Sequence, residues 1–492
     1  MKWLESVATH MGLVRDGPAP LRKHPALWEY FGMIFQQIVN EETGCLSYLI
    51  GCGQAGRAAV VDPGRDRVDE YLALARRKGL VITDIFETHV HADHVSGNQA
   101  LAGKCGARIR IHPAAEAAYP HTPVEDGSEV SIGAVSLKIL HTPGHTPDSI
   151  SLLVTDLSRG SEPWFVLTGD TLFVGDVGRP DFGGEMAAAN LYRSLTERLL
   201  VLPDSVEVYP AHGAGSTCGR AMSSKTASTI GFERRFNPAL RAEGVDAFVT
   251  RLMTGLPPKP PNFDRIIAKN RARMLPSTEE VAPRSAAQVR DILAKGGCVL
   301  DVRSPEEHGD GHIPGSINVW IESPQFSTRA GWFLPADAPI VLVAASPTDL
   351  ARAAQGLARI GLDDVAGYLQ WGMTDWRSQG LPVASVAQIT VHDLATMREE
   401  RPELVVVDVR DLFEWEDGHI EGAVHLPMGE AVRRMAELPA DRPKAVLCAG
   451  GLRSSTVISA LSREGMTVWY NVSGGMTAWV KAGYATLKST GP

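Results

Sequence analysis

The stretch Thr88-His89-Val90-His91-Ala92-Asp93-His94 places three imidazoles and a carboxylate within a few residues of one another. Residues 81–87 form an apolar run that leads directly into it and is typical of a β-strand ending at the cluster. Where a strand ends, the chain can fold all four polar groups inward. Neutral imidazole and carboxylate are ligands of zinc, iron and manganese. The stretch therefore predicts a metal site at the end of a strand.

Three further polar residues occupy similar positions later in the chain. His145, Asp170 and His212 each follow a strand-like apolar run and lie beside Gly or Pro. Loops at strand ends present functional groups from a rigid scaffold. Any one of the three alone would be an ordinary loop residue, but four such strand ends in order predict a complete metal shell.

This arrangement resembles the metallo-β-lactamase superfamily, whose H-x-H-x-D-H motif is matched in full by residues 89–94. The resemblance covers residues 31–255 and implies an αββα sandwich. Within the superfamily the chain looks most similar to the persulfide dioxygenases, which implies one Fe(II) per chain bound by His89, His145 and Asp170. Two His and one carboxylate with open positions are also the ligand set expected for non-haem Fe(II) that activates O2.

The resemblance leaves the number of metal ions open. In the dioxygenases the remaining polar residues surround the iron and orient its ligands, whereas glyoxalase II, a thioester hydrolase, uses them to bind a second metal. These residues are His91, Asp93, His94 and His212. Glyoxalase II adds a helical domain that helps to hold glutathione. Here a Pro-rich linker at residues 256–283 follows instead, which favours the dioxygenase.

Two segments supply candidate substrate-binding residues. Arg179 and Asp181 belong to a Gly-Arg-Pro-Asp-Phe segment that is similar to one near the substrate thiol in the dioxygenases. Cys218 and Arg220 lie on a loop past His212 that is too rich in Gly and Ser to pack as core. One hypothesis is that Arg220 activates Cys218 to pass sulfur between the two active sites. The alternative is a passive loop thiol, and Cys52 is a weaker candidate of the same kind.

Beyond the linker the chain repeats itself. Asp301-Val302-Arg303 recurs as Asp408-Val409-Arg410, and Gly372-Met373-Thr374 recurs as Gly475-Met476-Thr477. A period near one hundred residues indicates a duplicated domain rather than a solenoid. Each copy alternates short apolar strands with helical patterns, which predicts a parallel α/β sheet.

The first copy (residues 284–384) and the second copy (residues 388–486) resemble rhodanese domains. In the second copy Cys448 follows a strand, and the loop after it offers backbone N–H groups and a helix start that stabilise an anionic sulfur. Cys448 is thus the expected sulfur nucleophile, and Arg453 adds a fixed charge to the same loop. The other loop residues are Ala449, Gly450, Gly451, Leu452 and Ser454. The span from Cys to Arg has the rhodanese length rather than the longer phosphatase length, which favours sulfur transfer.

The first copy lacks this chemistry. With Gly361 aligned onto Gly465, it has Ala344 in place of Cys448 and Asp349 in place of Arg453. Without nucleophile and cation no persulfide can form there. We expect this copy to serve as a spacer or a dimer surface.

The composition sets broad limits. The 492 residues allow three domains, and 44% hydrophobic with 21% charged residues is typical of a soluble globular protein. A net charge of −9 argues against a nucleic-acid partner. No apolar run approaches the roughly 18 residues that a membrane span needs, and we expect neither a signal nor a transit peptide. Six scattered cysteines favour the reduced cytoplasm, and a homo-oligomer, a dimer or tetramer, is expected.

The combined domains resemble the persulfide dioxygenase–rhodanese fusions of bacterial sulfide detoxification. The resemblance implies a multidomain α/β and α+β fold and oxidation of a small thiol persulfide, such as glutathione persulfide, by O2 to sulfite and thiol. The rhodanese domain would interconvert sulfite plus persulfide and thiosulfate. Two alternatives are a glyoxalase II-like hydrolase with two metals fused to rhodanese, and a non-catalytic sulfur carrier. The complete metal shell argues against the carrier.

Overall fold

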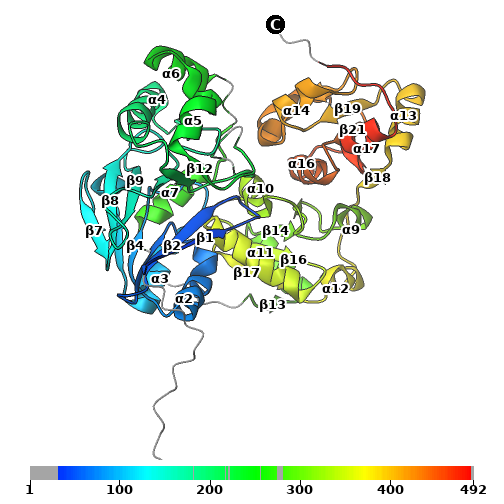
Figure 1. Cartoon of the computed structure of the whole chain (residues 1–492). Helices are drawn as coiled ribbons and strands as arrows, with labels where there is room; N and C mark the ends of the chain where they lie inside the picture. Colours follow the sequence, from blue (N-terminus) through cyan, green and yellow to red (C-terminus); the bar gives the residue numbers. More distant parts are fainter. Residues whose placement is uncertain are drawn as a thin grey trace, which may run out of the picture.

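The computed structural model describes residues 32–180, 182–216, 218–219, 222–254, 256, 258–273 and 281–488. Three units follow one another along the chain: a sandwich unit in blue to green, the first copy in yellow-green and the second copy in orange to red (Figure 1). Within these described ranges, no helix is both long and apolar enough to cross a membrane.

The sandwich unit contains two six-stranded sheets, with strand orders β1-β2-β3-β4-β5-β6 and β12-β11-β10-β9-β8-β7. The first sheet consists of β1 (Met33–Val39), β2 (Leu46–Cys52), β3 (Arg57–Val61), β4 (Val81–Phe86), β5 (Arg108–Ile111) and β6 (Thr122–Pro123). The second consists of β7 (Glu129–Ile132), β8 (Val135–His141), β9 (Ile150–Asp156), β10 (Phe165–Gly169), β11 (Glu207–Pro210) and β12 (Ser228–Thr229). The helices are α2 (Val68–Arg77), α3 (Asn98–Cys105), α4 (Gly184–Arg193), α5 (Ile230–Phe236), α6 (Val245–Met253) and α7 (Phe263–Arg271).

Apolar side chains that alternate along the strands build the layers of this unit. Phe86 of the first sheet and Leu137 and Phe165 of the second belong to one buried cluster between the sheets. On the outer face of the first sheet, Val60 packs with Tyr71 of α2. Helices α4 and α6 cover the second sheet in the same way. The expected αββα sandwich is confirmed.

The two copies have the same strand order, β13-β17-β16-β14-β15 and β18-β22-β21-β19-β20, and every pairing within them is parallel. The first copy consists of β13 (Pro283–Arg284), β14 (Cys298–Asp301), β15 (Ile317–Asn318), β16 (Ile340–Val343), β17 (Val365–Leu369), α8 (Ala286–Ala294), α9 (Pro305–Asp310), α10 (Phe326–Phe333), α11 (Pro347–Arg359) and α12 (Gly372–Ser378). The second consists of β18 (Ala387–Ile389), β19 (Val405–Asp408), β20 (Val424–His425), β21 (Lys444–Leu447), β22 (Trp469–Val472), α13 (Val391–Glu400), α14 (Leu412–Asp417), α15 (Ala431–Arg434), α16 (Leu452–Arg463) and α17 (Gly475–Lys481). The predicted parallel α/β sheets are confirmed.

The Pro-rich segment at residues 256–283, expected to be only a linker, instead contains α7. Asn270 near the end of this helix is buried and donates through Nδ2 to the carbonyl oxygens of His91 and His94, at 2.9 and 2.8 Å. Its Oδ1 accepts from the backbone N–H of Ser96 at 2.9 Å. The segment therefore fixes the loop that carries the histidine cluster. The sequence alone does not indicate this contact, because Asn270 and the histidines are far apart along the chain.

Candidate active sites

Three buried side chains that follow strands direct their metal-ligating atoms toward one point of the sandwich unit. A metal-ligating atom of each of His89, His145 and Asp170 lies within 4.8 Å of the others. His145 Nε2 is 3.4 Å and His89 Nε2 is 3.8 Å from Asp170 Oδ2. Both His145 Nε2 and Asp170 Oδ2 are buried, and neither has a hydrogen-bond partner among the residues that the structure describes. Such orphaned atoms are costly unless a cation satisfies them, so this donor set fits a metal ion.

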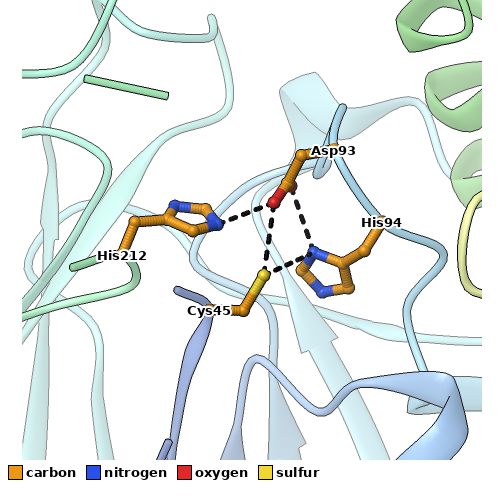
Figure 2. Close-up of side chains that lie close together, drawn as sticks. All are labelled: Cys45, Asp93, His94 and His212. Atoms are coloured by element: carbon orange, nitrogen blue, oxygen red, sulfur yellow. Dashed lines mark hydrogen bonds and ion pairs between the residues drawn. The ribbon is translucent and has the colours of Figure 1, made fainter. Parts of the chain in front are cut away.

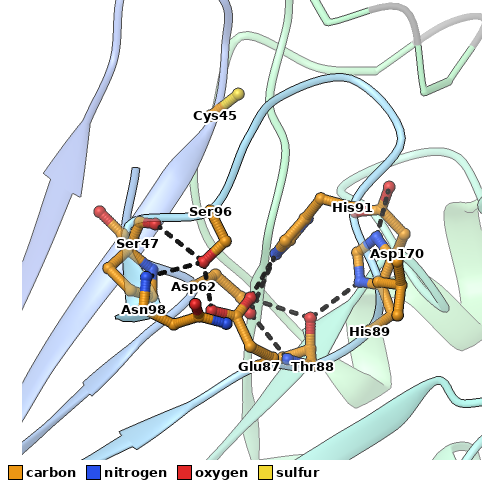
Figure 3. Close-up of polar contacts among 12 residues, drawn as sticks. Cys45, Ser47, Asp62, Glu87, Thr88, His89, His91, Ser96, Asn98 and Asp170 are labelled. Carbon is orange, nitrogen blue, oxygen red and sulfur yellow. Dashed lines mark hydrogen bonds and ion pairs between the residues drawn. The ribbon is translucent and has the colours of Figure 1, made fainter. Parts of the chain in front are cut away.

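Hydrogen bonds at the opposite ring nitrogens fix the tautomers that a metal requires. His145 Nδ1 donates to the carbonyl oxygen of Arg179 at 2.8 Å. Thr88 donates through Oγ1 to Asp62 at 2.9 Å, so it accepts from His89 Nδ1, also at 2.9 Å (Figure 3). In each histidine, Nε2 keeps its lone pair.

The charges of the three side chains suit the same role. Burial, the largest cause, lowers the pKa of both His89 and His145, so the imidazoles are neutral near neutral pH. Burial alone would raise the pKa of Asp170, but His212 and His89 outweigh it and hold that pKa below its usual range. Two neutral imidazoles and a carboxylate therefore face one point.

His212 connects this triad to a second cluster. Its Nδ1 donates to Asp170 Oδ1 at 2.6 Å and its Nε2 donates to Asp93 Oδ2 at 2.9 Å. Burial alone would lower the pKa of His212, but Asp170 and other neighbours raise this pKa well above its usual value. Both N–H groups of this ring are occupied by carboxylates.

The second cluster contains a thiol that the sequence analysis missed. Cys45 Sγ lies 3.3 Å from Asp93 Oδ2 and 3.9 Å from His94 Nδ1 (Figure 2). These three side chains and His212 could hold a metal ion together. Cys45 comes next to them because its backbone forms an isolated bridge with His212. No local pattern around Cys45 signals this proximity.

His91 belongs to a third cluster, with Asp62 and Glu87. Its Nε2 is 3.3 Å from both Asp62 Oδ1 and Glu87 Oε2 (Figure 3). Burial alone would lower the pKa of His91. The two carboxylates, of which Asp62 has the larger effect, raise this pKa well above its usual value. Asp62 follows β3 and has a φ of 50°, a backbone conformation that non-Gly residues rarely adopt. It therefore obeys the same strand-end pattern that identified His145 and Asp170.

The candidate substrate residues are only partly described. Asp181 and Arg220 lie outside the described residues. Arg179 is buried, and its guanidinium lies 6.0 Å from the ring of Phe263 in α7. Cys218 is within 4.8 Å of the ligating atoms of Asp170 and His212, as its position after His212 suggested.

The expectation that the loop past His212 does not pack as core is wrong at Cys218, and the contacts there favour the passive thiol. The side chain is 2% exposed, and burial raises its pKa to about 12. A loop rich in Gly and Ser is covered here by neighbouring segments, which its composition does not reveal. Cys52 is buried too, and its Sγ accepts from the backbone N–H of Ala134 at 3.4 Å.

The loop after β21 encloses the sulfur of Cys448. The Gly451 N–H donates to Sγ at 3.1 Å, and Ser454 Oγ lies 3.7 Å from it. Gly451 has a φ of 95°, which favours glycine and lets the loop turn its N–H inward. The chain thus builds the expected cradle around this sulfur.

The charge that Arg453 adds to this loop is already paired with two carboxylates. Arg453 Nη1 and Nη2 donate to the Glu414 carboxylate at 2.6 and 2.7 Å, and Nη1 lies 3.2 Å from Asp411 Oδ2. In the first copy the corresponding loop carries Ala344 after β16. Ser346 Oγ there accepts from the N–H of Asp349 and caps α11.

Comparisons with known proteins agree with these two kinds of site. The metallo-beta-lactamase superfamily matches residues 40–212, and the rhodanese-like domain matches residues 285–379 and 390–482. A solved metallo-beta-lactamase structure from Staphylococcus aureus is 33% identical, with a TM-score of 0.63, and covers 69% of this chain and 99% of its own. The mitochondrial persulfide dioxygenase ETHE1 of Homo sapiens is 28% identical over 239 residues, which is 48% of this chain and 87% of the relative. A hydroxyacylglutathione hydrolase from Nitrosococcus oceani is 36% identical over 169 residues, but these span 34% of this chain and 61% of the hydrolase.

The chain belongs to the metallo-β-lactamase superfamily, and two rhodanese-like domains follow its metal-binding sandwich. Its domain order and its similarity to persulfide dioxygenases confirm the expected resemblance to the persulfide dioxygenase–rhodanese fusions. The same matches confirm the expectation that the chain is an enzyme.

Proposed function

We propose that the sandwich unit is an iron-dependent persulfide dioxygenase and that the second copy is a thiosulfate sulfurtransferase. The convergence of His89 Nε2, His145 Nε2 and Asp170 Oδ2 carries the first half of this proposal, because the last two atoms have no hydrogen-bond partner among the described residues. Two His and one carboxylate leave coordination positions open, and Fe(II) held there would supply activation of O2 and a position for the persulfide sulfur. We expect about one iron per chain.

The overall reaction consumes one thiol persulfide, one O2 and one water. It yields the thiol, sulfite and two protons, because the terminal sulfur loses four electrons and O2 gains four. His212 orients the Asp170 carboxylate through Nδ1, and Asp93 occupies its other N–H. His91 Nε2 faces two carboxylates, whereas Nδ1 has no hydrogen-bond partner in the described part of the chain. Nδ1 is therefore the atom of this ring that can donate to the growing negative charge on the sulfur oxygens. Since both N–H groups of His212 are engaged by carboxylates, this role falls to His91.

In the second copy, the proposed reaction transfers sulfur to Cys448. The thiolate attacks the outer sulfur of thiosulfate, the S–S bond to the sulfonate sulfur breaks, and sulfite leaves with the electron pair. The Gly451 N–H stabilises the sulfur in its charged form. The reverse reaction joins sulfite from the sandwich unit to a sulfane sulfur on Cys448.

Thioester hydrolysis is the second candidate function. The cluster of Cys45, Asp93, His94 and His212 favours it, because these residues could hold a second metal. The similarity to the hydrolase, however, covers only 61% of the length of that relative. In the described part of residues 256–283, the segment after the sandwich contains α7 rather than a helical domain.

One set of measurements on the full chain separates these functions. Protein purified without oxygen is analysed for iron and zinc, then given either glutathione persulfide with O2 or a glutathione thioester. The dioxygenase predicts one iron per chain, O2 uptake and sulfite release, with negligible thioester cleavage. Two zinc ions and rapid thioester cleavage would contradict it.

The cellular setting is part of the proposal. All six cysteines are described and none forms a disulfide, which supports a reducing cytoplasm. We also propose a homo-oligomer, a dimer or tetramer, which a sedimentation measurement on the purified chain would test.

A further inference from the structure

An arginine of the first copy interacts electrostatically with the residues of the sulfur site of the second copy. Arg329 is on α10, and its Nε and Nη1 are buried without a hydrogen-bond partner in the described part of the chain. Its charge interacts with those of Cys448 and Arg453 in the transferase loop. It also interacts with Asp411 and Glu414, the two carboxylates that pair with Arg453. Burial, the largest cause, and Arg453 lower the pKa of Arg329 to about 10, which still leaves it charged at neutral pH. Buried N–H donors without a hydrogen-bond partner are costly, so Nε and Nη1 of Arg329 favour an anionic ligand.

The packing of α10 explains how a residue of one copy reaches the other. Phe333, one helical turn beyond Arg329, packs against the buried cluster that contains Cys448. Trp332 lies against Gly429 of the second copy, where an added Cβ would be 2.7 Å from its ring. Ala330 of α10 and Ala460 of α16 belong to one buried cluster, and the two helices lie near each other in Figure 1. The face of α10 that carries these side chains is therefore turned toward the transferase site.

Buried polar contacts hold the two copies in this arrangement. The Asn318 N–H at β15 donates to Ser459 Oγ of α16 at 2.9 Å, and Ser455 Oγ donates to Asn318 Oδ1 at 2.6 Å. Helix α16 begins directly after the Cys448 loop. Because α16 is docked on β15, the loop and Arg329 have a fixed relationship.

Of the charged groups that interact with Cys448, Arg329 is the one that can bind an anionic substrate. Arg453 is committed to Glu414 and Asp411, and these two carboxylates together outweigh its single charge. Without Arg329, the surroundings of the thiolate would repel the doubly charged thiosulfate or sulfite. Arg329 restores the balance, and its fork of N–H donors suits a planar or tetrahedral oxyanion.

We propose that Arg329 binds the sulfonate or sulfite group of the substrate at Cys448, so that the two copies form one composite transferase site. This inference rests on the transferase function proposed for the second copy. The first copy, although it lacks a nucleophile at Ala344, supplies the cation that the second copy does not have free. Its role is thus substrate binding across the domain boundary rather than spacing alone.

Charge-selective alkylation of Cys448 in the full chain tests the cation directly. The rates of Cys448 modification by iodoacetate, an anion, and iodoacetamide, a neutral analogue of similar size, are compared by mass spectrometry. Arg329→Gln should lower the iodoacetate rate about tenfold relative to that of iodoacetamide. Arg329→Lys, which keeps the charge, should retain most of the wild-type ratio. Arg265→Gln is the matched control, since Arg265 also has buried, unpartnered nitrogens but its charge interacts with Asp337 and Asp363 instead.

Thiosulfate kinetics supply the second measurement. Arg329→Gln should raise the KM for thiosulfate by about tenfold or more with a smaller change in kcat, and should leave the Tm equal or higher, because it removes a buried unpaired charge. An unchanged alkylation ratio in Arg329→Gln would overturn the proposal, as would a lower Tm with equal loss for both alkylating agents. If wild-type protein shows no thiosulfate turnover but Arg329→Gln still changes the alkylation ratio, the transferase function fails while the anion site stands.

Discussion

Arg359 near the end of α11 and Asp66 of the sandwich unit form an ion pair at 2.7 Å between two units of the chain. The same guanidinium lies 2.9 Å from Glu42, and the Arg359 backbone carbonyl accepts from Val95 N–H at 2.6 Å. Val95 directly follows His94 of the metal-binding motif. The first copy is thus attached to the sandwich unit next to its candidate metal centre.

Loss of the Arg359 charge should loosen this attachment. Removing one partner of a largely buried pair leaves the other carboxylate uncompensated, so Arg359→Ala is expected to lower the Tm by about 5 °C. Arg352→Ala is the control, because Arg352 pairs with Glu322 at an exposed position and such pairs contribute little. Equal Tm values for the two variants in differential scanning calorimetry would refute the expectation.

Asn270→Ala should weaken metal binding although Asn270 is not a ligand. The side chain holds the carbonyls of His91 and His94 in place, and loss of such supporting contacts typically lowers metal affinity by about 10- to 100-fold. Competition with a chelator measures this affinity. Asn190→Ala on α4, whose amide contacts Arg193 on the same helix, should bind iron like the wild type. An unchanged affinity in Asn270→Ala would show that α7 is only a connection.

Removal of a ligand should separate the two proposed activities. His89→Ala or Asp170→Ala is expected to reduce iron from about one per chain to nearly none and to abolish O2 uptake. Sulfur transfer from thiosulfate should continue at the wild-type rate because Cys448 belongs to another unit. His121→Ala serves as the control, since His121 contacts the Tyr119 carbonyl outside the cluster. Retention of a full complement of iron in His89→Ala would disprove the ligand assignment.

The sequence predicts the chemistry that follows single strands and misses what segments far apart in the chain bring together. The sequence identifies His145 and Asp170 because each follows an apolar run and lies beside Gly. Asp62 follows the same rule and could have been identified. Asn270 is 179 residues from its partner His91, and Cys45 is 48 residues from Asp93, so no local pattern indicated either contact. Arg329 illustrates a further limit, because its environment exists only after two domains have packed.

Cys218 tests how burial changes the interpretation of a thiol. Since its side chain is 2% exposed, the structure favours the passive thiol over sulfur relay. We expect no sulfur adduct on Cys218 after brief persulfide treatment and an unchanged ratio of thiosulfate to sulfite in Cys218→Ser. Cys52→Ser, which alters a buried thiol in the sandwich core, is the control. An adduct on Cys218, together with a lower ratio in its Ser variant, would restore the relay hypothesis.

Cys448→Ser should remove thiosulfate sulfurtransfer entirely. The Gly451 N–H and the loop would remain, but serine is a poor nucleophile toward sulfur and Ala344 of the first copy offers no substitute. Because the sandwich unit keeps its ligands, persulfide oxidation should continue, and sulfite rather than thiosulfate should accumulate. Cys298→Ser is a matched control, since Cys298 is buried in the first copy's core away from this loop. Product analysis by chromatography measures both anions. Sulfur transfer in Cys448→Ser above that of heat-denatured protein would show that another thiol carries the sulfur. Continued formation of thiosulfate from persulfide would show that sulfite is joined to the sulfane sulfur outside the second copy.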